Sequence, residues 1–158
     1  HLEKYKKKFF DRYKDNKLIK KYGVKNILIL SSLVEKEAKN KDDKLLISSV
    51  ILNRLNKNMK LQIDASVIAS LTEGNFKLNR SLTTKDLKYD HPLNTYIIKG
   101  IPEEMICYVG QETIELLLEN PKSNFLFYFF NILENKHIFS INYENHRKQL
   151  NEYRKKIK

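Results

Sequence analysis

The strongest constraint on the fold is a pair of apolar stripes with helical spacing. In residues 25–39, apolar side chains recur every three or four positions, as on one face of an α-helix. That stripe consists of Ile27, Leu30, Val34 and Ala38. Residues 43–56 repeat the pattern with Leu46, Ile47, Val50, Ile51 and Leu55. Asn40 ends the first segment, and Asp42 or Asp43 can cap the second. The sequence therefore predicts two helices, each with one buried face.

The remaining periodic segments predict an α+β fold, rich in helices, with a small antiparallel hairpin late in the chain. Residues 2–20 predict an amphipathic basic helix, ended by Gly23, that packs on the domain in preference to a membrane surface. Its stripe consists of Leu2, Tyr5, Phe9 and Tyr13. The later elements expected are a helix at 111–119, strands at 125–132 and 137–141, and a closing helix at 142–156.

We expect one catalytic domain over residues 1–158, with an N-terminal packing helix at 1–24 and a core at 25–158. Within it, residues 59–110 are too polar, and too often interrupted between short elements, to form the structural core. They predict a long ordered loop. The short elements expected there are a strand at 61–63 and helices at 65–71 and 84–87. Long ordered loops of this kind often carry function.

The net charge of +11 invites a nucleic-acid hypothesis. However, 25 of the 30 basic residues are Lys, whereas base recognition and bidentate phosphate contacts favour Arg. We therefore expect no nucleic-acid partner, and a basic surface also suits another anionic polymer. Cys107 is the single cysteine, which excludes an intrachain disulfide. The four His residues lack metal-ligand spacing, so we expect no metal and no cofactor.

No apolar run approaches the roughly 18 residues of a membrane-spanning helix. The chain opens on His1 instead of Met, so we interpret it as a fragment of a longer protein. The lack of an apolar span here therefore says nothing about an anchor elsewhere in that protein.

Six short segments resemble, in the same order, the motifs of one enzyme family. They read S-S-L-V-E-K-E-A at 31–38, V-I-L-N-R-L at 50–55, M-K-L-Q-I-D at 59–64, N-T-Y at 94–96 with G-I-P at 100–102, F-L-F-Y-F at 125–129 and H-I-F-S at 137–140. Together they resemble the YceG-like family of endolytic murein transglycosylases over about residues 26–155. Each motif alone is weak, and their order and spacing make the resemblance specific.

The chain also departs from the family pattern. Ile63-Asp64-Ala65 stands where the family has Thr-Asp-Pro, and His146-Arg147 stands where it has a His-Asn pair. The family's Ser-Pro-Tyr before Asn-Thr-Tyr and its Pro-Pro-Gly turn are replaced as well, by the residues at 91–93 and 103–105. These changes concern the glycan subsites and leave the predicted catalytic acid intact. Arg54, in the second motif, is expected to form a structural ion pair with a nearby carboxylate.

The resemblance implies a lytic transglycosylase, which cleaves the MurNAc–GlcNAc bond of peptidoglycan and leaves an anhydro-muramic acid end. One carboxyl group suffices, because the sugar's own 6-hydroxyl is the nucleophile, whereas ordinary glycosidases use two carboxylates. Glu35 is the predicted general acid and base, at the base of a cleft where burial raises its pKa. Asp64 and Glu37 are the alternatives. Without the resemblance, Glu35 would be interpreted as a surface residue or as a partner of Lys39.

Five side chains are predicted to line that cleft and bind the sugar: Gln62, Asp64, Asn94, Tyr96 and His137. Each type can hydrogen-bond or stack, as sugar recognition requires. Structural alternatives remain open for four of them. Asp64 can cap a helix at 65–71, Asn94 can form a turn, and Tyr96 and His137 can be half-buried packing residues.

The resemblance further implies peptidoglycan glycan strands as the substrate and cell-wall synthases as candidate partners. It places the protein in the bacterial cell envelope, anchored in the inner membrane with the catalytic domain on the extracytoplasmic, periplasmic side. Two functions from other classes remain as alternatives. One is a basic nucleic-acid-binding module, for which residues 4–21 offer lysines interleaved with aromatics. The other is a non-catalytic glycan-binding partner of the division or elongation machinery.

Overall fold

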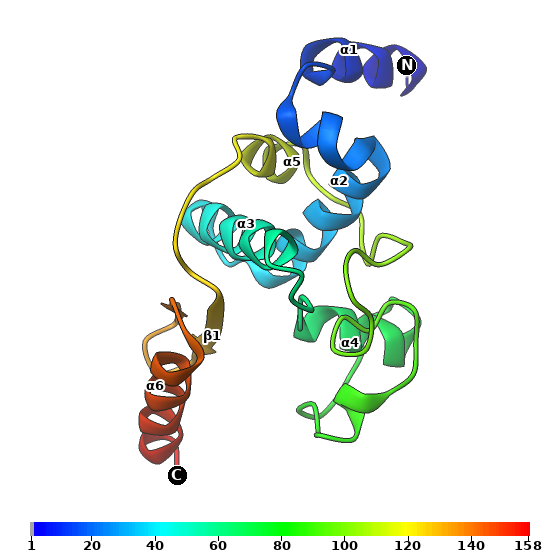
Figure 1. Ribbon diagram of the computed structural model, residues 1–158. Helices are drawn as coiled ribbons and strands as arrows, with labels where there is room; N and C mark the ends of the chain where they lie inside the picture. Colours follow the sequence, from blue (N-terminus) through cyan, green and yellow to red (C-terminus); the bar gives the residue numbers. More distant parts are fainter. Residues whose placement is uncertain (1) are drawn as a thin grey trace.

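The computed structural model describes residues 2–158, and for residues 2, 3, 5 and 6 it describes the backbone alone. His1 and the side chains of the predicted stripe positions Leu2 and Tyr5 therefore lie outside the described part. Helices come first, and a two-stranded hairpin and a closing helix follow, which confirms the α+β prediction (Figure 1). The elements are α1 (Leu2–Tyr13), α2 (Lys17–Glu37), α3 (Lys41–Asn56), α4 (Asp64–Thr72), the 3₁₀ turn η1 (Asp86–Lys88), α5 (Gln111–Leu118), β1 (Phe127–Asn131), β2 (Lys136–Ser140) and α6 (Tyr143–Lys156).

The predicted N-terminal helix is interrupted earlier than expected. α1 and α2 are separated by a short turn, and Asn16 caps α2 because its side-chain oxygen accepts a hydrogen bond from the Leu18 N–H at 2.9 Å. Gly23 does not end a helix but kinks α2, with a φ of 78° that glycine adopts without strain. The second predicted helix is therefore the distal part of α2.

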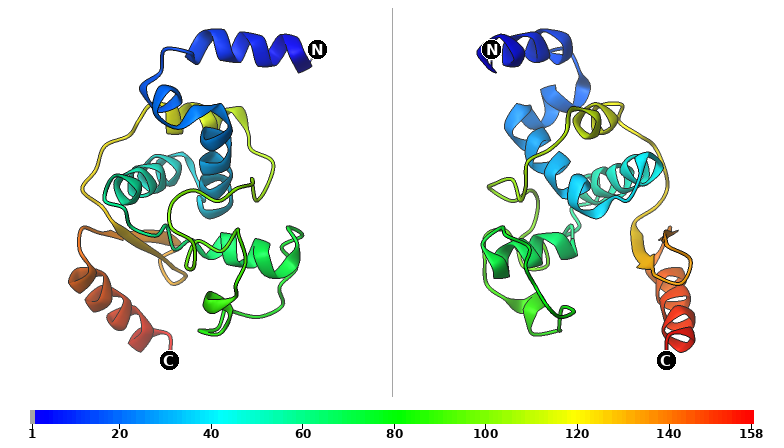
Figure 2. Two further views of the ribbon diagram at one scale, coloured as in Figure 1. Left: turned by 45° about the vertical axis from the view of Figure 1, so that its right-hand side comes forward. Right: turned by 180° about the vertical axis from the view of Figure 1, so that it is seen from behind.

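The core of the molecule lies where α2, α3 and α5 meet, with α1 at one end of this group (Figure 2). Most of the predicted stripe positions are at most 1% exposed: Ile27, Leu30, Val34, Ile47, Val50 and Ile51. Ala38, Leu46 and Leu55 are half-buried. Because each fully buried aliphatic side chain contributes roughly 1.5–3 kcal/mol, these two helices supply much of the stability that holds the rest in place.

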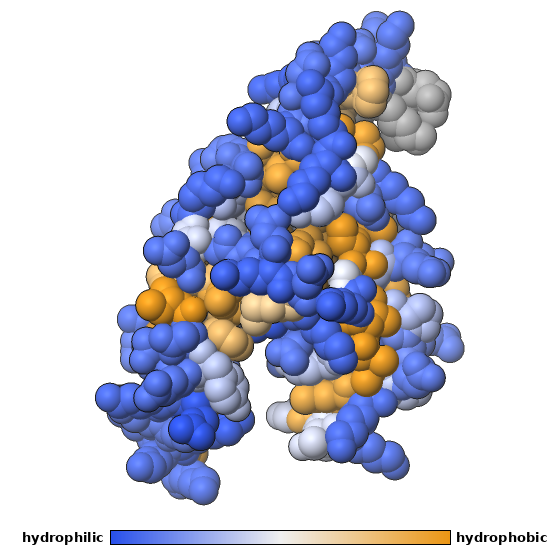
Figure 3. All heavy atoms as spheres, in the orientation of Figure 1, coloured by the Kyte–Doolittle hydropathy of each residue, from blue (hydrophilic) through white to orange (hydrophobic). Residues whose placement is uncertain are grey.

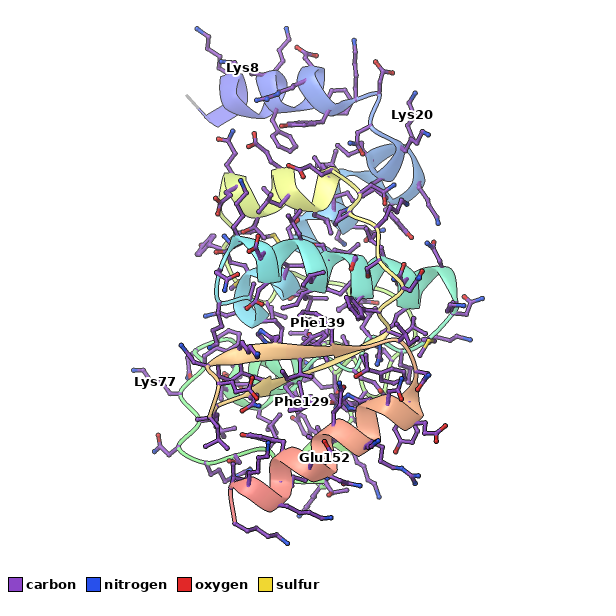
Figure 4. The ribbon with its side chains drawn as sticks, turned by 90° about the vertical axis from the view of Figure 1, so that its left-hand side faces the viewer. Lys8, Lys20, Lys77, Phe129, Phe139 and Glu152 are labelled. Atoms are coloured by element: carbon purple, nitrogen blue, oxygen red, sulfur yellow. The ribbon has the colours of Figure 1, made fainter. Side chains whose placement is uncertain are left out.

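Two lobes extend from the core on the same side (Figure 1). We call them the hairpin lobe, residues 127–156, and the α4 lobe, residues 61–99. In the hairpin lobe, β1 and β2 pair antiparallel from Phe127↔Ser140 to Asn131↔Lys136. Phe139 packs against the core, whereas Phe129 lies on the face of the hairpin that carries α6, with its ring 5.4 Å from that of Tyr153 (Figure 4).

The α4 lobe is held together by side chains more than by regular structure. The predicted strand at 61–63 is absent. Instead, the N–H of Gln62 donates to the Thr95 carbonyl at 3.1 Å and the N–H of Ile63 donates to Thr95 Oγ1 at 2.8 Å. These bonds hold the segment around residue 95 against the start of α4. No helix in the described part of the chain is both long enough and apolar enough to cross a membrane.

Candidate active site

A cleft of about 470 Å³ opens between the hairpin lobe and the α4 lobe. Figure 3 shows the molecule hollowed at this place. Its walls carry two carboxylates, two arginines, two histidines and several aromatic rings; the ionisable members are Glu37, Asp64, Arg54, Arg154, His137 and His146. A second hollow, of about 490 Å³, lies beside α6 and contains a single carboxylate, from Glu152. The first cleft therefore has the chemistry of an active site.

Glu37, the last residue of α2, lines this cleft from the core side. Its Oε1 accepts a hydrogen bond from the Ala65 N–H at 3.0 Å, at the start of α4, and the Tyr128 hydroxyl also donates to the carboxylate. Burial raises the pKa of Glu37 to about 7, and the negative charge of Asp64 acts in the same direction. The two donated hydrogen bonds lower that pKa, but burial outweighs them. Glu37 can therefore hold or release a proton near neutral pH.

Asp64 is the first residue of α4 and is exposed to the cleft. It does not cap the helix: the N-cap position is Ile63, and no side chain of that residue bonds there. Instead, its Oδ1 accepts a hydrogen bond from the Tyr96 hydroxyl at 2.7 Å. Burial, together with this neighbouring carboxylate, raises the pKa of Tyr96, so that the tyrosine stays a hydrogen-bond donor. Asp64 and Tyr96 thus enter the cleft as one paired unit.

Asn94, which was predicted to bind sugar, is not among the residues that line the cleft. Its side chain is fully buried, and its amide nitrogen donates to the carbonyls of Leu87 at 3.2 Å and Tyr89 at 2.8 Å. Its side-chain oxygen accepts from the Tyr96 N–H at 3.0 Å. The turn-forming alternative is therefore correct, because Asn94 shapes the segment that presents Tyr96.

Gln62 is exposed in the cleft wall. Its Oε1 accepts a hydrogen bond from Arg54 Nη1 at 3.3 Å. Arg54 itself is buried and donates to the carbonyls of Leu126 at 2.6 Å and Lys60 at 2.8 Å. It therefore ties α3 to the residues that directly precede each lobe, and the expected ion pair with a carboxylate is not formed among the described residues.

His137 also reaches the cleft, from β2. Its Nδ1 lies 2.8 Å from Asp43 Oδ2, and its ring packs edge-on against Phe130 and Tyr128. At 8% exposure, most of the imidazole is enclosed. The residue thus lines the cleft and also has the packing role that was its alternative.

Glu35 lies elsewhere. It is on α2 above the buried Leu30 and Val34, as predicted, but it is not among the residues that line the cleft. Its Oε2 accepts a hydrogen bond from the hydroxyl of Thr113, a fully buried residue of α5. Two positions along a helix correspond to a turn of roughly 200°, so Glu35 faces α5 while Glu37 faces the cleft. The site predicted around Glu35 therefore does not coincide with this cleft.

Sequence reasoning missed the contribution of the hairpin lobe. Tyr128 of β1 and four residues of α6 line the cleft: His146, Leu150, Tyr153 and Arg154. The F-L-F-Y-F motif contained a signal for Tyr128, since it places a phenol in an otherwise apolar strand. α6 gave no such signal, because its sequence resembles an ordinary solvated helix.

Metal binding has no support in the described side chains, among which no group of three His, Cys, Asp or Glu could hold an ion. The arrangement can instead perform proton transfer. It combines a carboxyl group with a pKa near neutrality, a second carboxylate beside it, and aromatic and amide groups that can contact a sugar.

Known proteins resemble this chain in sequence and in fold. The model of the YceG-like family matches residues 1–152. The chain is 32% identical over 145 residues to an endolytic murein transglycosylase of Bacillus subtilis, covering 92% of the chain and 39% of that protein. It is 30% identical over 137 residues to an endolytic murein transglycosylase of Streptococcus pneumoniae, covering 85% of the chain and 24% of that protein.

A solved structure shows the same fold. It is a crystal structure of a yceG-like protein from Listeria monocytogenes, with a TM-score of 0.76 and 35% sequence identity, and the match covers 89% of the chain and 44% of that protein. The chain thus spans less than half the length of each of these relatives.

Proposed function

The chain belongs to the YceG-like family, and from this premise we propose that it is the catalytic domain of a lytic transglycosylase. The proposed reaction cleaves the MurNAc–GlcNAc bond within peptidoglycan strands and leaves an anhydro-muramic acid end. Two kinds of observation support it: relatives named endolytic murein transglycosylases match most of the chain, and the cleft has an acid suited to the reaction. We propose residues 1–158 as a single domain of that function.

The observation that carries the proposal is the environment of Glu37. A general acid must be protonated at the working pH and must recover its proton after the reaction. Burial and the neighbouring Asp64 give Glu37 a pKa of about 7, which meets both needs. We therefore propose Glu37, in place of Glu35, as the general acid and base, because Glu35 lies outside the cleft beside Thr113.

The proposed reaction needs no water. Glu37 donates its proton to the oxygen that links the two sugars, and the bond from C1 to that oxygen breaks as positive charge develops on the ring. The same sugar's 6-hydroxyl then attacks C1 and passes its proton to the Glu37 carboxylate. One bond to C1 is broken and another formed, the anhydro ring closes, and the acid returns to its starting form.

Asp64 has a supporting role in this scheme. Its charge beside Glu37 favours the protonated form of the acid, and an ionised carboxylate stabilises positive charge on a sugar ring. The Tyr96 hydroxyl, at 2.7 Å, fixes the orientation of Asp64. Gln62 and His137, which also line the cleft, are the proposed sugar contacts.

Two carboxylates in one cleft also fit a hydrolase, in which Asp64 would direct a water molecule. Mass analysis of peptidoglycan digested by the protein separates the two reactions. We expect fragments that end in anhydro-muramic acid, lighter by one water than the hydrolytic product and without a reducing end. Fragments with a reducing muramic acid would show hydrolysis and overturn the lytic mechanism.

A murein substrate corresponds to a function in the cell envelope. Attachment to the inner membrane, an extracytoplasmic position and an association with cell-wall synthases remain proposals that rest on the family resemblance. The cleft does not favour the nucleic-acid alternative, because its two carboxylates balance its two arginines.

A further inference from the structure

One face of α6 is turned toward the cleft. Four of its residues line the cleft, at spacings of four, three and one that place them along a single helical face: His146, Leu150, Tyr153 and Arg154. Other α6 residues, including Arg147, Lys148 and Lys155, line a separate hollow. The helix therefore has a cleft face and an outer face with different surroundings.

The cleft face is not a packed core stripe. No residue of α6 is fully buried, although a closing helix normally buries its inner stripe. The helix is held to the hairpin by ring contacts: His146 stacks on Phe127 at 5.3 Å, and Tyr153 lies tilted against Phe129 at 5.4 Å. Because the rest of this face remains open, it forms a wall of the cleft with surface available to a ligand.

Two polar groups on this wall have no partner in the described part of the chain. The guanidinium of Arg154 forms no ion pair or hydrogen bond to a described residue, whereas the other cleft arginine, Arg54, donates to backbone carbonyls. His146 Nδ1 is buried without a hydrogen-bond partner among the described residues. Burial, and to a lesser extent the charges of Arg54 and Arg154, lowers the pKa of His146, so its ring is neutral at pH 7. A buried unpaired polar atom is costly unless a ligand satisfies it.

The two carboxylates of the cleft and Arg154 lie on opposite walls. Glu37 and Asp64 lie on the side formed by α2 and α4, and Arg154 lies on the opposite wall, near the C-terminal end of α6. A ligand that spans the cleft would therefore meet acid chemistry on one side and a free cation on the other. The sugars of a glycan strand present hydroxyl and acetamido groups, whereas its carboxylates belong to the peptides attached to it.

We propose that the α6 wall formed by His146, Leu150, Tyr153 and Arg154 binds the acidic peptide that the glycan strand carries, with Arg154 holding a peptide carboxylate. This inference rests on the proposed function, since it names the part of that substrate which the second wall recognises. Guanidinium pairs with carboxylate through two parallel hydrogen bonds. Leu150 and Tyr153 offer apolar surface for peptide side chains, and the His146 nitrogen is a neutral hydrogen-bonding group suited to an amide.

The test compares two variants on two substrates. Arg154→Gln removes the charge on the cleft face, and Lys155→Gln removes one charge from the outer face of the same helical turn. The substrates are uncrosslinked peptidoglycan strands that carry their peptides and the same strands after the peptide carboxylates have been converted to primary amides. Removal of the peptides by an amidase is avoided, because it would expose a lactyl carboxylate on each muramic acid. Binding is measured by calorimetry with Glu37→Gln as the background, so that cleavage does not interfere, and cleavage is measured separately without that change.

We expect Arg154→Gln to weaken binding of the strands with free peptide carboxylates by roughly 10- to 100-fold, the range of a charge-assisted hydrogen bond, and to leave binding of the amidated strands unaffected. Arg154→Lys should fall between the two, because it keeps the charge but not the paired geometry. Lys155→Gln should change neither substrate appreciably. Equal losses on both substrates, or no loss on either, would overturn the peptide assignment. If the unmutated protein binds peptide-bearing strands but does not cleave them, the proposed function is overturned. The binding comparison with Arg154→Gln would still show whether the α6 wall recognises the peptide.

Discussion

Glu35 and Glu37 are two positions apart on α2 and have different chemical surroundings. Glu35 accepts a hydrogen bond from Thr113 in the contact between α2 and α5. Glu37 is placed against the Ala65 N–H in a cleft that also contains Asp64. The same side chain is thus a link between helices at one position and a titratable acid at the other.

The raised pKa of Glu37 predicts a pH dependence for the reaction. The acid must be protonated to act, so kcat/KM should be level below pH 7 and fall about tenfold per pH unit above the pKa of about 7. Asp64→Asn removes a negative charge that raises this pKa, and it should shift the alkaline limb to lower pH. Rate measurements from pH 5 to 9 on both proteins check this, and an unmoved limb in the variant would contradict the coupling.

The same pKa predicts an unusual stability effect. Between the ordinary value of 4.5 and about 7, the folded protein binds a proton that the unfolded chain releases, so this contribution to stability is present at low pH and is lost as pH rises to 7. At pH 8 the ionised Glu37 costs on the order of 3 kcal/mol. Glu37→Gln should therefore raise the free energy of unfolding in urea at pH 8 and have much less effect at pH 5. A loss of stability at pH 8 would contradict the assignment.

At the scale of elements, the position of Tyr96 depends on how the loop before it is tied to α4. Thr95 Oγ1 accepts from the Ile63 N–H at 2.8 Å and lies 2.8 Å from Ser66 Oγ. Asn94 holds the preceding turn through two backbone carbonyls. This irregular segment is therefore fixed by buried polar side chains, which place the Tyr96 hydroxyl on Asp64.

Asn94→Ala should consequently destabilise the fold. It removes the donor to the carbonyls of Leu87 and Tyr89 and the buried acceptor of the Tyr96 N–H, which costs on the order of 2–3 kcal/mol. Denaturant titration measures this, with Gln62→Ala as the control, because Gln62 is exposed and its loss should change stability by about 0.5 kcal/mol or less. If Asn94→Ala were as stable as the unmutated protein yet failed to bind glycan, the sugar-binding role indicated by its motif would be restored.

Local periodicity predicted the regular elements well. The apolar stripes of α2 and α3, the helix at 111–119, the hairpin and the closing helix all occur near their expected places. The errors lie where a single side chain determines the local backbone structure. Asn16 caps a helix inside the segment that was predicted to be continuous, and the segment at 61–63 bonds to Thr95 instead of to another strand.

At the scale of the whole molecule, the cleft brings together α2, α3, α4, the loop before residue 96, the hairpin and α6. Short sequence motifs located most of these segments but could not orient them. One signal was available: Leu30, Leu33 and Glu37 follow the i, i+3, i+7 spacing of a single helical face, and both leucines are fully buried. Glu37, which continues this buried stripe, is therefore a better candidate for a buried acid than Glu35, which lies two residues earlier.

The α6 wall could not be predicted in this way. Its cleft face consists of a histidine, a leucine, a tyrosine and an arginine. The helix as a whole contains five cations and two carboxylates, which is typical of a solvated surface. The role of this helix depends on the hairpin. Ring contacts with the hairpin phenylalanines hold α6 so that one face of the helix is directed toward the α4 lobe. Such placement is a property of the tertiary fold.

The central claim is that Glu37 is the acid, and the most direct test compares Glu37→Gln with Glu35→Gln in cleavage of purified peptidoglycan strands. Glutamine is nearly isosteric with glutamate but cannot donate and recover a proton. Glu37→Gln should lower kcat by about 10⁴-fold or more, at or beyond the upper end of general acid–base catalysis, while glycan binding persists. Glu35→Gln should stay within about threefold of the unmutated protein, because its amide oxygen still accepts from Thr113. Loss of cleavage in Glu35→Gln with activity retained in Glu37→Gln would contradict the account and return the catalytic role to Glu35.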